Sequence, residues 1–197
     1  MRAPDPVGFA CAAAALLGLL LSPPVRELLL ARMSLHMNMQ LPLLVACGAG
    51  LVAPWHAAMA PRLAPVNRLG LSGWLLGTGL FGVWMVPRAL DAAVADAGID
   101  ALKVASLLLA GAVLALSWRP AGAVVQAFFV GNTVWMTVTV GLLVAQAPTR
   151  LCNAYLEGDQ RQAGYGLFLL GIAGGAVWLG SLRFERKRSK PTCNQHG

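Results

Sequence analysis

Residues 101–118 read ALKVASLLLAGAVLALSW and contain a single charged side chain, that of Lys103. A helix needs about 20 mostly apolar residues to cross the hydrocarbon core of a bilayer, and this stretch comes close to that length. The whole chain has the same character, because 57% of its 197 residues are hydrophobic and only 12% are charged. A soluble domain of this size could not bury so much apolar surface, so the composition indicates a membrane protein.

Five other apolar stretches resemble this one, and together they predict an all-α fold, a polytopic transmembrane helix bundle of about six spans. The expected spans are residues 7–22, 38–55, 70–87, 101–118, 122–146 and 164–182. We expect residues 1–182 to form one bundle and residues 183–197 to form a basic cytoplasmic tail. A cleaved signal peptide is the alternative for the first span, although LLLSPPVREL (19–28) is a poor cleavage site.

The charged residues predict an orientation for this bundle. The formal net charge is +7, and much of it lies in RFERKRSK (183–190), directly after the last span. Such a run is typical of a cytoplasmic anchor and does not indicate a nucleic-acid site. Basic residues also mark the loops after the second and fourth spans, at Arg62, Arg68 and Arg119. The loop after the third span instead carries Asp91, Asp96 and Asp100. Both termini are therefore expected to be cytoplasmic.

Cysteines and glycines give two structural expectations. The four cysteines have no paired spacing that would indicate a disulfide framework or a thiolate metal site; they are Cys11, Cys47, Cys152 and Cys193. Glycines at helical spacing, Gly73 with Gly77 and Gly171 with Gly175, are expected to let neighbouring helices approach closely.

The stretch RMSLHMNMQLP (32–42) concentrates soft metal ligands in a chain otherwise rich in aliphatic residues. On a helix Met33, His36, Met37 and Gln40 share one face, and Met39 lies beside His36 on its flank. Pro42 has no N–H to donate to the carbonyl of Asn38, so it is expected to kink the helix and weaken the turn that precedes it. Thioether and imidazole groups together suit Cu(I) better than hard cations. The alternative is that the methionines fill gaps between helices and His36 lies at the polar interface.

Short motifs at the same predicted side of the membrane accompany this stretch. They comprise His36, Met37 and Gln40; Trp84, Met85 and Pro87; Ala101, Leu102, Lys103 and Val104; and Asp159, Gln160 and Gly164. In their order and spacing, over about residues 25 to 180, the chain resembles the CtaG family of cytochrome c oxidase assembly factors. Those proteins carry H-M-x-x-H, W-H-x-P, A-L-E-H and a D-Q pair followed by glycine.

The resemblance implies a multi-pass protein of the bacterial inner membrane that handles Cu(I) at the periplasmic face. Its implied partners are cytochrome c oxidase subunits and a periplasmic copper chaperone. The candidate metal-binding residues are His36, Met37, Met85, Asp159, Met33 and Met39. Three family histidine positions hold other residues here, Gln40, Met85 and Val104, and Lys103 replaces the family glutamate. Either the site has been retuned toward thioether ligands or it has been lost.

Several of these residues also have ordinary structural explanations. Asp159 is expected either to support His36 or to help start the last helix. Lys103 is expected to snorkel or to pair with Asp100 or another acid of the outer loop. His56 is expected in the interfacial belt at the opposite side, and His196 in the polar tail.

Two function classes follow: a copper-handling assembly factor, and a metal-free membrane scaffold of the same fold. A transporter has less support, because the spans carry few polar groups near mid-membrane. An enzyme is not expected, because no nucleophile and base or paired carboxylates converge. Copper content in the purified protein would separate the first two classes.

Overall fold

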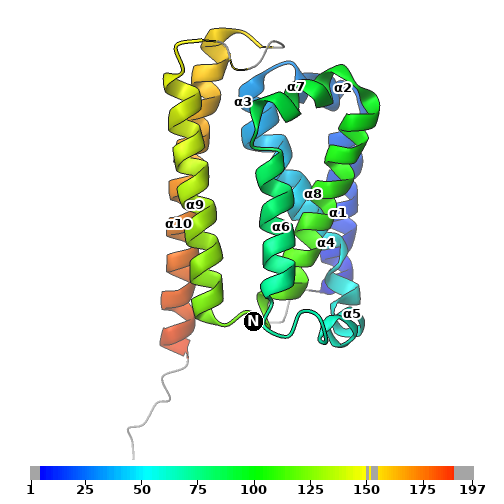
Figure 1. Cartoon of the computed structure of the whole chain (residues 1–197). Coiled ribbons are helices and arrows are strands. Elements are labelled where there is room, and N and C mark those ends of the chain that lie inside the picture. The colour runs from blue at the N-terminus through cyan, green and yellow to red at the C-terminus, as the bar shows by residue number, and fades with distance from the viewer. Residues whose placement is uncertain (1–4, 150, 152–154, 189–197) are drawn as a thin grey trace, which may run out of the picture.

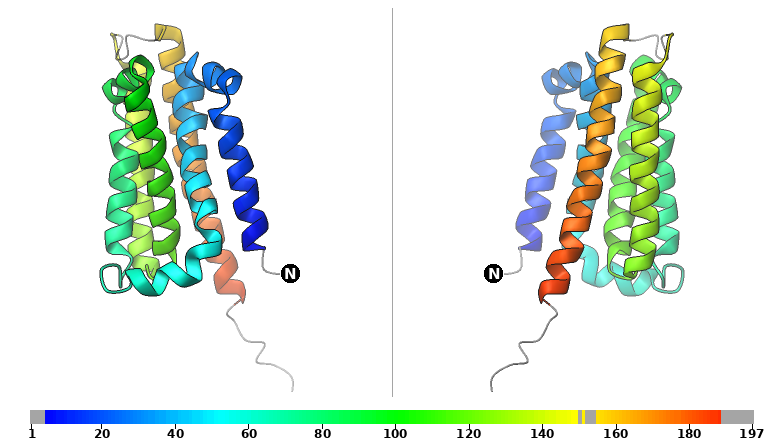
Figure 2. Two further views of the ribbon diagram at one scale, coloured as in Figure 1. Left: turned by 90° about the vertical axis from the view of Figure 1, so that its right-hand side faces the viewer. Right: turned by 90° about the vertical axis from the view of Figure 1, so that its left-hand side faces the viewer.

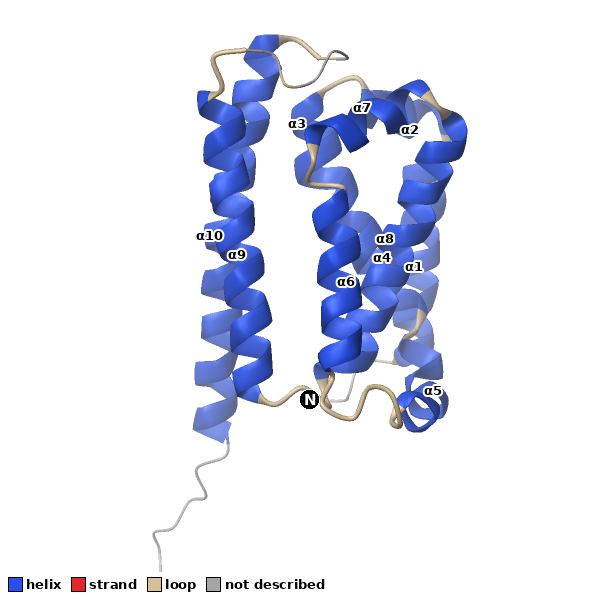
Figure 3. Ribbon diagram, in the orientation of Figure 1, coloured by secondary structure: helices blue, strands red, loops and turns tan. Residues whose placement is uncertain are grey.

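The described part of the chain is helical throughout. The computed structural model describes residues 5–149, 151 and 155–188, and its regular elements there are all helices (Figure 3). The elements are α1 (Pro6–Leu21), α2 (Pro23–Leu30), α3 (Met33–Leu35), a π-helical turn η1 (His36–Gln40), α4 (Leu41–Leu51), a 3₁₀ turn η2 (Ala53–Trp55), α5 (His56–Leu63), α6 (Leu71–Val83), α7 (Pro87–Ala95), α8 (Ala97–Trp118), α9 (Ala123–Gln146) and α10 (Glu157–Arg188). The predicted all-α class is confirmed.

Among the described residues, fewer helices than the six expected spans are long and apolar enough to cross a bilayer. By length and composition, four helical stretches could cross a bilayer: Met33–Leu63, Ala97–Trp118, Ala123–Gln146 and Gly158–Leu182. A fifth candidate is the pair α1 and α2, which is bent by 69° between its two parts. The expected third span is the apolar helix α6, which has only 13 residues. At about 1.5 Å per residue, α6 alone is shorter than the hydrocarbon core, which is about 30 Å thick.

The helices form two groups in the view of Figure 1, and Figure 2 shows the same bundle turned by 90° to either side. The helices α9 and α10 lie side by side as a hairpin, while α8 packs against both α4 and α6, and α1 packs against α4. The first residue of α1 and the last turn of α10 lie at the same end of the bundle, which also carries α5 (Figure 1). We call this the α5 end. The short helices α2, α3 and α7 lie at the opposite end, the α7 end. Part of the expected tail, residues 183–188, continues α10.

Glycines let these helices approach closely, as the sequence predicted for two pairs. A Cβ added at Gly73 would lie 1.8 Å from the Ser117 hydroxyl oxygen of α8, and one at Gly171 would lie 2.9 Å from a methyl of Val138 of α9. The closest approach to another backbone was not predicted: a Cβ at Gly111 of α8 would lie 1.9 Å from the backbone oxygen of Val45 of α4. The backbones of α4 and α8 therefore meet almost directly.

The turn before Pro42 adopts a π-helical conformation. The N–H of Leu41 donates to the carbonyl of His36, five residues earlier, in place of the usual four. Pro42 has no N–H to offer the carbonyl of Asn38, so the ordinary ladder cannot continue there. The expected weak turn is thus present, and it takes the form of a wider helical turn that includes His36.

Candidate functional site

The candidate site lies at the α7 end and is assembled from distant parts of the chain. His36 and Gln40 come from η1, Lys103 and Asp100 from the first turns of α8, and Tyr155 from the segment before α10. Both His36 and Lys103 have no exposed surface, and Asp100 is 5% exposed. A fully buried lysine is rare in any protein and needs partners for its charge.

His36 uses both of its ring nitrogens. The Nδ1 atom is 2.9 Å from the Tyr155 hydroxyl, and the Nε2 atom is 2.8 Å from Nζ of Lys103. An ammonium group only donates hydrogen bonds, so Nε2 must be the accepting nitrogen. The ring is therefore the neutral tautomer with its proton on Nδ1, where it can be donated to Tyr155.

The ammonium group of Lys103 has three partners, two in hydrogen bonds and one in an ion pair. Besides His36, these are the side-chain oxygen of Gln40 at 3.2 Å and a carboxylate oxygen of Asp100 at 2.7 Å. Lys103 and Asp100 are three residues apart on α8 and so share one face of that helix. The predicted pairing of Lys103 with Asp100 is confirmed, whereas its contacts with η1 were not predicted.

Arg26 of α2 completes the charged group from the surface side. Its guanidinium approaches one carboxylate oxygen of Asp100 through two nitrogens, at 2.7 and 3.0 Å. The side chain of Arg26 is 37% exposed, so it connects the buried pair to the outside. A continuous chain of contacts thus runs from Arg26 through Asp100, Lys103 and His36 to Tyr155, and we call it the lysine network. Its charged groups are the cations of Arg26 and Lys103 and the carboxylate of Asp100, and the neutral Gln40 lies beside Lys103.

Asp159 does not contact His36 directly. It lies in the first turns of α10, and its carboxylate accepts hydrogen bonds from the backbone N–H of Met33 and, at 2.8 Å, from the Ser34 hydroxyl. These groups are at the beginning of α3, where backbone donors have no partner within the helix. Asp159 therefore caps α3 from another helix and holds the segment that carries His36.

The methionines separate into two kinds. Met33, Met37 and Met85 are buried in one hydrophobic cluster, in which leucines of α1, α4, α8 and α10 also pack. Met39 is 52% exposed and lies outside this cluster. Next to Met85, the indole N–H of Trp84 donates to the Ser106 hydroxyl at 2.8 Å, which ties the end of α6 to α8. These three thioethers are therefore core residues, in a cluster that also contains Tyr155 of the lysine network.

The sequence analysis did not single out Arg26 or Tyr155. It treated Gln40 only as a position where the family has a histidine. Each is an ordinary residue in its own segment, and their importance arises only when α2, η1 and the start of α10 meet α8. The single usable signal was the charge of Lys103 inside an apolar span, because such charges need buried partners.

Over the described ranges, no three His, Cys, Asp or Glu side chains form a group suited to a metal ion.

Chemically, this arrangement holds an internal cation. The nitrogen of His36 that would be available to a metal already accepts a hydrogen bond from an ammonium group. The other nitrogen faces Tyr155.

Comparisons with family models, curated proteins and solved structures find no match. The CtaG resemblance therefore rests on the motifs in the sequence alone.

Proposed function

We propose that this chain is a multi-pass assembly factor for cytochrome c oxidase in the bacterial inner membrane, working as a metal-free scaffold. In this proposal the α7 end faces the periplasm. One observation carries the metal-free part: Nζ of Lys103 lies 2.8 Å from Nε2 of His36. The oxidase part rests on the sequence resemblance to the CtaG family.

The position of Lys103 opposes copper binding for two reasons. Coordination of Cu(I) by an imidazole uses the lone pair of a ring nitrogen, and the lone pair of Nε2 is already engaged by the ammonium. A metal cation at that nitrogen would also meet the charge of the ammonium at close range, where little water screens the repulsion. Lys103 would have to leave its acceptors on His36, Gln40 and Asp100 before copper could bind.

A surface for a protein partner is available next to the network. A cavity of about 520 Å³ lies at the α7 end, and Tyr155 and Asp159 are among its lining residues. Tyr155 contacts His36, and Asp159 holds the start of α3. A partner segment bound here would therefore touch the network at Tyr155 and the segment that carries His36 at Asp159. In the proposal, a periplasmic segment of an oxidase subunit binds in this cavity.

The second candidate is Cu(I) handling by thioethers, and one observation favours it. Met33, Met37 and Met85 are buried together at the same end as His36, and sulfur is a preferred donor for Cu(I). The periplasmic copper chaperone would be the partner in that case. The enzyme class has no support in either candidate.

Oxidase assembly in cells distinguishes these candidates. Deleting the gene is expected to lower assembled oxidase at unchanged transcript levels. Restoring the protein as the double variant Met37→Leu, Met85→Leu should return full oxidase activity even at limiting copper, because leucine keeps the volume of the core but has no sulfur. Cells lacking the protein should not be rescued by added copper.

The matched control is Met39→Leu, which changes an exposed methionine of the same segment. If the buried double variant fails at limiting copper, recovers with added copper and folds like the control, the copper candidate replaces the scaffold. If the deletion leaves assembled oxidase unchanged, the oxidase assignment itself is wrong.

A further inference from the structure

One polar side chain of α9 faces outward from the middle of an apolar helix. The helix is long and apolar enough to cross a bilayer, and Asn132 is the tenth of its 24 residues. At about 1.5 Å per residue, Asn132 lies at least about 13 Å from either end of the helix. Its side chain is exposed and makes no hydrogen bond with any residue that the structure describes. In hydrocarbon, a carboxamide without a partner is costly.

Other side-chain amides of the bundle do have partners. Asn67 donates to the Ser117 hydroxyl at 2.8 Å, and Gln126, on α9 itself, donates to the carbonyl of Trp118 at 2.8 Å. The fold thus satisfies these amides within the chain. The partner of Asn132 has to come from outside the chain.

The residues around Asn132 form a stripe along the outer side of α9. Phe128, Trp135 and Leu143 are 67%, 72% and 65% exposed. With Asn132 and the half-buried Thr139, they follow one another at intervals of three or four residues, so all five share one face of the helix. We call these five residues the α9 stripe. Such spacing is suited to side-by-side packing against another helix.

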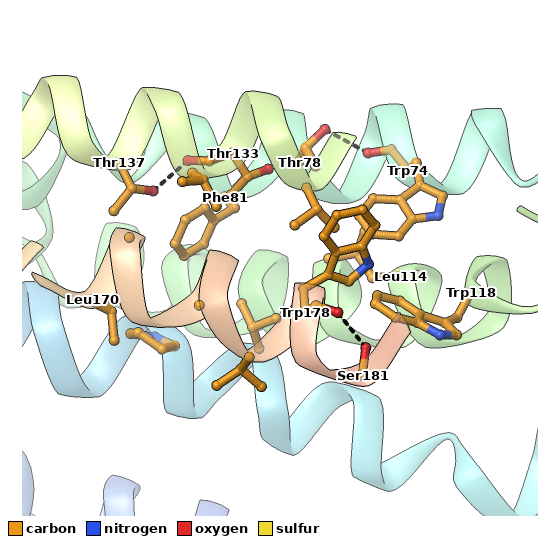
Figure 4. A pocket seen from close by; sticks show the side chains of 17 residues that line it. Trp74, Thr78, Phe81, Leu114, Trp118, Thr133, Thr137, Leu170, Trp178 and Ser181 are labelled. Atoms are coloured by element: carbon orange, nitrogen blue, oxygen red, sulfur yellow. Dashed lines mark hydrogen bonds between the residues drawn. The ribbon is translucent and has the colours of Figure 1, made fainter. Parts of the chain in front are cut away.

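The opposite face of α9 is turned toward the rest of the chain. It lines an apolar cavity of about 630 Å³ between the two helix groups (Figure 4). There the hydroxyls of Thr133 and Thr137 donate to the carbonyls of Phe129 and Thr133, both at 2.8 Å. On its sides α9 packs against α10 and touches α6, and neither covers Phe128 or Trp135. The α9 stripe is therefore the face of α9 that is open to a further helix.

We propose that the α9 stripe binds the α9 stripe of a second copy of this chain, in a parallel twofold dimer within the membrane. A carboxamide carries both donors and an acceptor, so two identical side chains satisfy each other. Copies of one membrane protein share one orientation, and a twofold axis along the membrane normal therefore brings Asn132 opposite its counterpart. Paired asparagines fix the register of parallel helices in the same way. Phe128 and Trp135 then pack about one turn away on either side.

Energy transfer in vesicles measures the strength of this dimer. The full chain, labelled with donor or acceptor, is reconstituted in phosphatidylcholine vesicles over a range of protein-to-lipid ratios. Asn132→Leu should lower the dimerisation constant about tenfold, which is about 1.4 kcal/mol and within the range of interhelical hydrogen bonds in membranes. Asn132→Gln keeps the carboxamide and should stay closer to the wild type than Asn132→Leu does. Thr133→Val removes a hydroxyl from the inner face of the same helix and should dimerise like the wild type.

Photo-cross-linking in native membranes identifies what the α9 stripe touches. Phe128 is replaced by the photoreactive p-benzoylphenylalanine, and the matched control is the same replacement at Phe9 of α1, which is 57% exposed in the other helix group. Irradiation should give a product of twice the mass of the chain from position 128 and not from position 9. Adding Asn132→Leu to the variant at position 128 should reduce this product.

Three results would overturn the proposal. Equal energy transfer in the wild type and Asn132→Leu would remove the carboxamide from any interface. Cross-linking of position 128 only to a different membrane protein would assign the α9 stripe to a helix of that protein. Cross-linking only to lipid would make the stripe an ordinary lipid-facing surface. Far-ultraviolet circular dichroism and gel filtration confirm that each variant is folded.

Discussion

Lys103 is the residue whose environment decides how the α7 end can work. Its ammonium group hydrogen-bonds to His36 and Gln40, and its charge is compensated by an ion pair with the carboxylate of Asp100. Arg26 adds a second cation to the same carboxylate, so the formal charge of the group is positive. A cation supplied by the chain itself therefore occupies the place beside the imidazole that a metal ion would need.

Removing the charge of Asp100 should destabilise the protein strongly. In Asp100→Asn, the ammonium of Lys103 would remain buried without a counterion, a change that typically costs about 3–5 kcal/mol. Thermal unfolding in detergent, compared with wild type, measures this loss. The matched control is Asp96→Asn at the beginning of α8, where the side chain caps the N–H groups of Gly98 and Ile99. Asparagine caps as well as aspartate, so the control should change stability by less than about 0.5 kcal/mol. Equal effects of the two substitutions would contradict the assigned role of Asp100.

At the scale of elements, the helix pair α4 and α8 fixes the position of the network. Gly111 and Gly48 lie where these helices meet, and a Cβ added at Gly48 would be 2.0 Å from the backbone oxygen of Leu108. Because η1 runs directly into α4, the close contact between α4 and α8 fixes the position along the bundle axis at which His36 faces Lys103. The wide turn η1 then places the imidazole and the amide of Gln40 on the same ammonium.

Substituting Gly111 by alanine should separate α4 from α8. The new Cβ would lie 1.9 Å from the backbone oxygen of Val45. This clash can be relieved only if one of the two helices moves. We expect a loss of about 2 kcal/mol or more in unfolding free energy. The control Gly131→Ala on α9 meets no atom within 4 Å and should be neutral or stabilising by about 0.5–1 kcal/mol. Thermal unfolding of both variants in detergent distinguishes these outcomes, and equal melting temperatures would refute the close-contact explanation.

The sequence predicted those features that depend on local composition. Long apolar runs gave the helices, and glycines at helical spacing gave the contacts of Gly73 and Gly171. Pro42 located the irregular turn. Its π-helical form was not predicted, because it depends on the N–H of Leu41 donating to the carbonyl of His36. Pro23 and Pro24 predicted where the first span ends, although not the 69° bend between α1 and α2. The short length of α6 was missed, because hydropathy averaged over a window does not register where a helix ends.

The candidate site was less predictable, because it depends on contacts between distant segments. Lys103 and Asp100 are neighbours on one helix, and their pairing followed from the spacing. His36 lies 67 positions before Lys103 and 119 positions before Tyr155 in the sequence. No local pattern connects them. The sequence suggested ligands for an external cation, and the packing of α8 against η1 places the ammonium of Lys103 beside one of them, His36.

For the whole molecule, the two ends have different chemistry. The α7 end carries the lysine network and a partly polar cavity, and an apolar cavity between the helix groups has indole rings at its α5 end. In the proposed function, the cavity at the α7 end receives a segment of the partner protein.

The central claim is that Lys103 takes the cation position at His36, and Cu(I) titration tests it most directly. Purified protein in detergent is titrated against a chromogenic Cu(I) chelator, beside the variants Lys103→Met and His36→Ala. The wild type should take no more Cu(I) from the chelator than His36→Ala does. Lys103→Met, which frees the imidazole nitrogen and adds a thioether, should gain one equivalent. A wild-type protein that binds one Cu(I) per chain and loses it in His36→Ala would contradict the account.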